Sequence, residues 1–207
     1  VQDDDRDGAS ERDVSLGGDA GPLRPEEVTA RNQADGRSEA EFCQALRGND
    51  LETMSRLLES GCDVNALLDI GQKDDTGQPI RATALGLSAD CRSAEVSRHL
   101  LDRGADPSLC SSTGHTPLMD AARGNSLPLM QLLLEAGAEL DVVNPSDGRT
   151  AFHYACARNR PDCVEMLVAA GCDVGLRDHR RQNGRDIAQD AGNEAVLRRL
   201  DQLKRTK

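Results

Sequence analysis

One segment of the chain is echoed by a similar segment 34 residues later. The stretch Gly-His-Thr-Pro-Leu-Met-Asp-Ala-Ala begins at Gly114, and Gly-Arg-Thr-Ala-Phe-His-Tyr-Ala-Cys begins at Gly148. A second marker, a glycine that follows an apolar stripe, recurs at intervals of 43, 33 and 34 residues. This period indicates one small unit that is copied and stacked, because a unit of that size cannot bury its own apolar face. The marker glycines are Gly61, Gly104, Gly137 and Gly171.

Each copy is predicted to be a pair of short helices. Apolar residues recur at helical spacing, as in the stripe from Leu51 through Met54 and Leu57 to Leu58, and the marker glycine then ends the second helix. The five units are expected at about 38–65, 82–108, 111–141, 145–174 and 178–203.

The connection between the first two units is longer than the others. The first glycine interval exceeds the second by 10 residues (43 − 33), and the excess lies in residues 66–82. Gly71 and Gly77 lead us to predict a long loop there, a long finger in the stack. Three apolar side chains of this segment either pack on the neighbouring unit or anchor a partner. They are Leu67, Leu68 and Ile70.

Residues 1–37 differ from the rest in composition. They are acidic, begin with Asp3-Asp4-Asp5 after two residues, and show no apolar period. Such a segment cannot bury enough surface to offset the entropy of ordering, so we predict a disordered tail before a repeat domain at 38–207.

Composition excludes several classes of protein. A net charge of −11 argues against a general nucleic-acid binder, and no apolar run reaches the roughly 20 residues that a membrane span needs. The seven cysteines are odd in number and several fall at apolar helix positions. We therefore expect reduced cysteines and a cytoplasmic or nuclear protein.

The repeated motifs resemble those of ankyrin repeats. Thr116-Pro117-Leu118 matches the family's helix start, Thr150-Ala151-Phe152-His153 is a looser version, and Leu133-Leu134-Glu135-Ala136-Gly137-Ala138 matches the second helix and its exit. The resemblance covers about residues 38–203. It implies an all-α ankyrin-repeat solenoid of five helix-turn-helix units with β-turn fingers. It also implies a monomer that binds proteins on a concave face of fingers and first helices, with no catalytic residue and no cofactor.

A metal site is the main chemical alternative. His153 and Cys156 lie one helical turn apart, with Cys163 and Cys172 further along, and both residue types bind zinc. In the resemblance, however, His153 occupies a common helix-start position and bonds locally to Thr150. We therefore expect no metal.

Asn65 is a candidate for modification. It closes the sequence Asp63-Val64-Asn65, with Leu57 eight residues earlier. Ankyrin repeats with that arrangement can be substrates of an asparaginyl hydroxylase. The alternative is that Asn65 only shapes the turn.

Charge is distributed unevenly along the repeats. Residues 38–143 contain 17 acidic and 8 basic residues, whereas residues 144–199 contain 8 acidic and 9 basic residues. Arginine forks suit carboxylates, so we predict that the fingers bind an acidic or C-terminal segment of a partner; a solvated surface is the alternative. The candidate partner-binding residues are Arg149, Arg158, Arg177, His179, Arg180, Arg181, Arg123, Tyr154 and His115, the last expected to be solvated.

The predicted function is a non-catalytic protein-interaction module, either an adaptor, a targeting subunit or an inhibitor. Two alternatives stay open. The acidic first units would suit a chaperone that shields a basic client protein, and the start at Val1 would suit a regulatory segment of a larger enzyme or channel.

Overall fold

The structure, a computed structural model, describes residues 38–90 and 94–205, and all of them belong to the unit Gly36–Lys207. The predicted tail, residues 1–37, lies outside the described residues.

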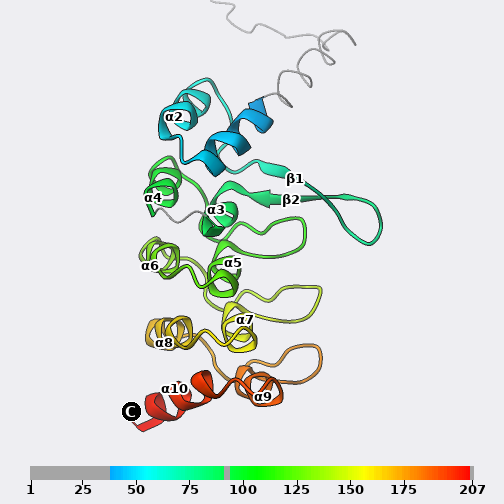
Figure 1. The fold of residues 1–207 in the computed structure, drawn as a ribbon, viewed down its shortest axis with the longest axis vertical. Helices are drawn as coiled ribbons and strands as arrows, with labels where there is room; N and C mark the ends of the chain where they lie inside the picture. Colours follow the sequence, from blue (N-terminus) through cyan, green and yellow to red (C-terminus); the bar gives the residue numbers. More distant parts are fainter. Residues whose placement is uncertain (1–37, 91–93, 206–207) are drawn as a thin grey trace, which may run out of the picture. The chain divides into compact units, whose positions relative to one another are not determined.

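Five helix pairs follow one another along the described part of this unit (Figure 1). First helices pack against first helices, as α5 does against α3 and α7, and second helices pack likewise. We call the side formed by the first helices and the loops that precede them the finger face. The pairs are 38–48 with α2 (Leu51–Glu59); α3 (Ala84–Leu87) and a 3₁₀ turn (Ser88–Asp90) with α4 (Ala94–Asp102); α5 (Pro117–Gly124) with α6 (Leu127–Glu135); α7 (Ala151–Ala157) with α8 (Pro161–Ala170); and α9 (Gly184–Asp190) with α10 (Glu194–Arg205).

The helix starts follow the repeated motif. The Thr116 hydroxyl accepts the amide of Met119 at 3.2 Å, and Pro117 occupies the first turn, where no amide donor is needed. In the last unit Asn183 takes the place of the threonine and accepts the amide of Asp186 at 2.9 Å. The cap is therefore retained although the Thr-Pro-Leu sequence is not.

The long finger predicted at 66–82 is present, but its arms are strands and not a loop. Strands β1 (Leu67–Lys73) and β2 (Pro79–Thr83) form an antiparallel hairpin, which projects beyond the other fingers in Figure 1. Gly71, read as a loop residue, lies at a bulge with a φ of 74°. The excess residues extend both arms of the finger, and this preserves the stack because neither arm enters the helix layers.

The hairpin turn has the bonding of an ordinary finger. Asp74 donates its amide to the carbonyl of Gln78 at 2.9 Å, as Ser111 does to His115 at 2.8 Å. The β2 strand is also bonded to the next finger, because Ser112 donates its amide to Arg81 at 2.9 Å. The hairpin is thus a finger with lengthened arms, attached to the third unit.

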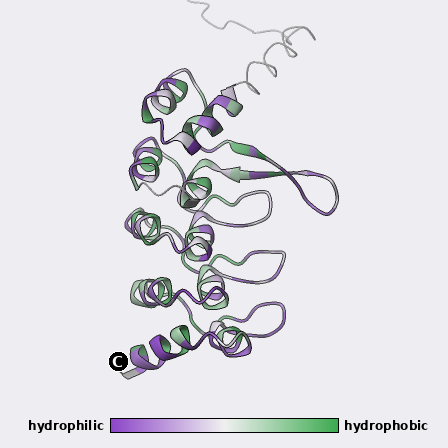
Figure 2. Ribbon diagram, in the orientation of Figure 1, coloured by the Kyte–Doolittle hydropathy of each residue, from purple (hydrophilic) through white to green (hydrophobic). Residues whose placement is uncertain are grey.

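The core lies between the two helix layers and is built mainly from leucine, alanine and methionine, as the shortage of aromatic residues predicts. Leu100, Met130 and Leu133 are completely buried. In Figure 2, α10 shows both hydrophobic and hydrophilic segments; it buries Val196 and Leu200 and exposes charged residues on its other side. No described helix combines the length and apolar character that crossing a bilayer requires.

Candidate functional site

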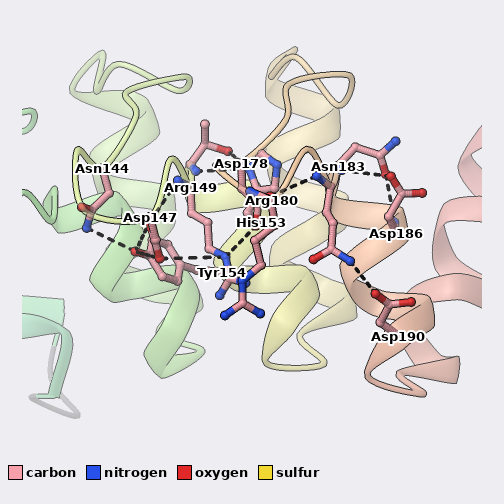
Figure 3. A network of polar contacts seen from close by, with 12 residues as sticks. Asn144, Asp147, Arg149, His153, Tyr154, Asp178, Arg180, Asn183, Asp186 and Asp190 are labelled. Carbon is pink, nitrogen blue, oxygen red and sulfur yellow. Dashed lines mark hydrogen bonds and ion pairs between the residues drawn. The ribbon is translucent and has the colours of Figure 1, made fainter.

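The finger between the fourth and fifth units is built around one buried carboxylate. The side chain of Asp178 is 1% exposed and accepts the amides of Arg180 and Gln182 at 2.9 and 3.0 Å (Figure 3). Its other oxygen accepts Nε of Arg149 at 3.3 Å. Burial alone would raise the pKa of Asp178, but these hydrogen bonds and the guanidinium together hold the pKa below its usual value. The finger tip is therefore rigidly held.

His153 connects the fourth first helix to the same finger. Its Nδ1 accepts the amide of Thr150 at 3.2 Å, so its Nε2 carries the proton and donates to the carbonyl of Leu176 at 3.0 Å. Burial lowers the pKa of His153, which stays neutral. Both ring nitrogens are engaged, so His153 has the local bonding role that the resemblance implied. Among the described residues no group of three His, Cys, Asp or Glu side chains has metal-binding geometry.

Tyr154, one of the candidate partner-binding residues, is largely buried and bonded within its own finger. It is only 8% exposed, and its hydroxyl donates to the carboxylate of Asp147 at 3.0 Å and accepts Nδ2 of Asn144 at 3.2 Å. Burial and the neighbouring Asp147 raise the pKa of Tyr154. The side chain holds its finger in place, and its sequence position on a helix gave no sign of this.

His115 is not the solvated side chain that we expected. Its ring lies 5.3 Å from the ring of Tyr154 and is half-buried, and Nδ1 bonds to the hydroxyl of Thr113 at 3.0 Å. Burial lowers the pKa of His115. It therefore contributes a neutral aromatic surface to the finger face rather than a free charge.

The candidate arginines fall into two groups. Arg149, Arg177 and Arg123 are tied into the fold: Arg149 bonds to Asp178, Arg177 donates to the carbonyl of Arg181 at 2.6 Å, and Arg123 pairs with Asp120 at 3.1 Å. The second group is exposed and makes no ion pair with any other described residue. The same is true of His179, whose ring is also exposed. The second group consists of Arg158, Arg180 and Arg181.

A pocket lies beneath the hairpin, and little in the sequence predicts it. It has a volume of about 370 Å³ and lies between the β1–β2 hairpin, α3 and the third unit. The sequence marked Ile70 as an apolar residue without an explanation, and Ile70 lines this pocket. The pairing of β1 with β2 brings Ile80 to the pocket wall, and α3 contributes Leu87. A second pocket of about 530 Å³ is lined by the apolar Phe152 and Val168 and by residues of α10.

Asn65 has a structural role. Its amide donates to the carbonyl of Gly104 at 3.2 Å and accepts the backbone amide of Asp106 at 2.8 Å. Asp141 makes the same kind of bond to Asp173 two units later. The side chain thus ties successive units together, and its hydroxylation stays a hypothesis.

A family model described as ankyrin repeats, three copies, matches residues 42–144 and again 85–178. Together the matches extend from residue 42 to residue 178, more than half of the 207 residues. The chain belongs to the ankyrin-repeat family. The ankyrin repeat is a protein-interaction module, so the solenoid implied by the motifs and its general role are both supported.

Similar ankyrin-repeat proteins differ widely in length. Mouse cyclin-dependent kinase 4 inhibitor B is 34% identical over 139 residues, which are 67% of this chain and 98% of that protein. Human ankyrin repeat domain-containing protein 37 is 30% identical over 154 residues, 74% of this chain and 87% of that protein. The E3 ubiquitin-protein ligase KEG of Arabidopsis thaliana is 30% identical over 148 residues, but these are only 9% of that ligase.

Buried His153 and half-buried His115 predict a stability that falls on acidification. Since burial lowers the pKa of His153 and His115 below the 6.5 of a free side chain, the unfolded chain binds more protons below pH 6.5. Stability is therefore complete above that pH and declines as pH falls through the lowered values. Thermal melts between pH 7.5 and 5.0 should show a falling Tm, and His153→Gln should flatten the slope. The exposed His179→Gln is the control, and an equal flattening there would contradict the assignment.

Proposed function

We propose that this ankyrin-repeat protein is a non-catalytic binding subunit, acting as an adaptor, a targeting subunit or an inhibitor. A protein partner docks on the finger face. An acidic or C-terminal carboxylate segment of that partner binds the arginines of the last two units.

The observation that carries this proposal is the group of exposed arginines without an ion pair among the described residues. Arg158 ends α7, and Arg180 and Arg181 lie on the finger that precedes α9, in the adjacent unit. Guanidinium groups bind carboxylates through paired hydrogen bonds and are enriched at binding hot spots. Within residues 38–90 and 94–205, no carboxylate has to be displaced before these three arginines bind one.

The rigidity of the finger supports the same proposal. Asp178 fixes the backbone of Arg180, and the amide of His179 bonds to the carbonyl of Asp147 at 3.0 Å, which ties this finger to the preceding one. A surface that is already ordered loses little conformational entropy on docking, so more of the contact energy appears as affinity.

The similar proteins support an action through binding alone. The mouse relative is named as an inhibitor of cyclin-dependent kinase 4, and the matched segment is 98% of its length. A stack of this size can therefore make up nearly the whole of a protein that inhibits. The free cysteines among the described residues suit a reducing compartment, the cytoplasm or nucleus.

Charge reversal tests the proposal. We expect the triple variant Arg158→Glu, Arg180→Glu, Arg181→Glu to lose proteins that the wild type captures from a cell lysate, as measured by quantitative mass spectrometry. The control is Arg198→Glu, an equally exposed change on α10 that should keep those proteins. Circular dichroism should show both variants folded. Equal capture by the triple variant would overturn the proposed site.

The chaperone alternative has its own supporting observation. Residues 38–143 have an excess of nine acidic residues (17 − 8), which would attract a basic client. In the same capture experiment, that alternative predicts newly made basic proteins whose binding is lost at high salt and is unaffected by the arginine reversals.

A further inference from the structure

The hairpin forms one wall of a pocket on the finger face. Strand pairing places Ile80 opposite Gln72, and both line the pocket together with Ile70 and Leu87. The opposite wall is formed by the third unit, including His115. A volume of about 370 Å³ is at the lower end of the range for ligand sites, so it suits a side chain rather than a large ligand.

We propose that this pocket binds one aliphatic side chain of the partner segment whose acidic residues contact the exposed arginines. The inference rests on the proposed function and deepens it, because it specifies the chemistry of the partner: an aliphatic anchor and an acidic group on one extended segment.

The side of the pocket that is formed by the hairpin and α3 favours an aliphatic occupant. Ile70, Ile80 and Leu87 are each partly exposed and line that side, while polar side chains such as Thr113 and His115 line the rest. Arg123 and Asp120 also line the pocket, and they pair with each other at 3.1 Å. A charged side chain would lose its hydration there without a counter-ion, whereas an aliphatic one gains from leaving water.

The pocket is held open by bonds between elements. The amide of Ser112 donates to the carbonyl of Arg81 at 2.9 Å, and the Arg81 amide donates to the Ser112 hydroxyl at 2.9 Å. Asp74 closes the hairpin turn by accepting the amides of Thr76 and Gln78. The hairpin is therefore fixed to the third unit before any partner arrives.

The stack sets the distance between anchor and charge. The pocket involves α5, which packs on α7, and α7 packs on α9. Neighbouring helices lie about 8–10 Å apart, so Arg158 is roughly one step and Arg180 roughly two steps from the pocket. An extended segment advances about 3.3 Å per residue. The acidic residues should therefore lie about three to six positions from the aliphatic anchor.

Charge complementarity decides which segment can occupy both places. Arg158, Arg180 and Arg181 are exposed and suit carboxylates. The apolar side of the pocket suits an aliphatic side chain instead. A purely acidic segment would leave the pocket empty, and a purely apolar one would leave the arginines unpaired. The mixed segment satisfies both ends.

Selection from a library of random 12-residue peptides, displayed on phage, tests this directly on the full chain. We expect enrichment of peptides that carry Leu, Ile or Val three to six positions from Asp or Glu. Fluorescence anisotropy should then show binding at least about tenfold weaker to Ile80→Lys, the loss expected for one buried aliphatic side chain. Ile80→Ala, which is milder for the fold, should weaken binding in the same direction.

Val143→Lys is the matched control, since Val143 is an apolar side chain, 47% exposed, outside the pocket. It should bind as the wild type does. In a selected peptide, the acidic residues can be moved next to the aliphatic residue. This peptide should bind more weakly, because it can no longer reach the pocket and the exposed arginines at the same time.

The outcomes separate the two proposals. Peptides that bind Ile80→Lys and Ile80→Ala unchanged, or a selection that enriches no aliphatic residue or no peptide, would overturn the pocket while leaving the arginine site to its own test. Peptides sensitive to Ile80→Lys but not to the arginine reversals would overturn the two-ended segment. Insensitivity to every variant would overturn both.

Discussion

Replacing Gly184 by alanine is expected to destabilise the last unit by about 2–3 kcal/mol. A Cβ at Gly184 would lie 2.4 Å from Cε1 and 2.7 Å from Cδ1 of Phe152, and 2.9 Å from Sγ of Cys156. Phe152 is 2% exposed and belongs to the hydrophobic core, where such close contacts are not tolerated. Either α9 must shift away from α7 or the ring must leave its position.

Thermal melting should show this as a fall in Tm of about 5–10 °C. Amide exchange should accelerate most across α9 and α10, because a solenoid unit is stabilised mainly by its neighbours. The control is Gly124→Ala in α5, where a Cβ would meet nothing within 4 Å and helix propensity improves. An equal Tm for Gly184→Ala and the wild type would contradict the close approach of α9 to α7.

Asp178→Ala is expected to lower stability by about 2–4 kcal/mol and to loosen the proposed binding finger. The change removes a carboxylate that is 1% exposed and leaves the amides of Arg180 and Gln182 without their acceptor. It also leaves the guanidinium of Arg149, 23% exposed, without its buried partner. Urea denaturation measures the loss, and exchange of the Arg180 and Gln182 amides reports the finger itself.

Asp74→Ala provides a close comparison. Asp74 accepts the amides two and four residues ahead, Thr76 and Gln78, just as Asp178 does, but it lies at the exposed hairpin tip. It should change Tm much less, because water can replace its hydrogen bonds. If both variants lose equal stability, burial and the Arg149 pair are not what makes Asp178 important.

Much of the fold followed from local sequence. The repeat phase, the capping residues Thr116 and Thr150, and the glycine at 171 with its φ of 93° all depend on neighbours within a few residues. Ankyrin motifs are informative for that reason: each position has one backbone role. The strands of the finger at 66–82 were not predicted for the same reason. Gly71 and Gly77 were recognised as turn residues, but the pairing of the two arms depends on residues far apart in the sequence.

The binding residues were harder to predict. Nothing near Tyr154 in the sequence shows that its hydroxyl bonds to Asn144 and Asp147. Likewise, nothing near Arg149 shows that its guanidinium bonds to a carboxylate 29 residues away. Charge counts identified the basic region but could not separate bonded arginines from exposed ones. That separation needs the distances between fingers.

The sequence by itself determined that helix pairs recur in step and stack, because helix caps, turns and apolar stripes act over a few residues. Only the tertiary structure decided which side chains remain available to a partner and where a pocket opens. Those depend on contacts between successive units, as where Ser112 holds the hairpin and Asp178 holds Arg149, and such contacts leave no periodic mark along the chain.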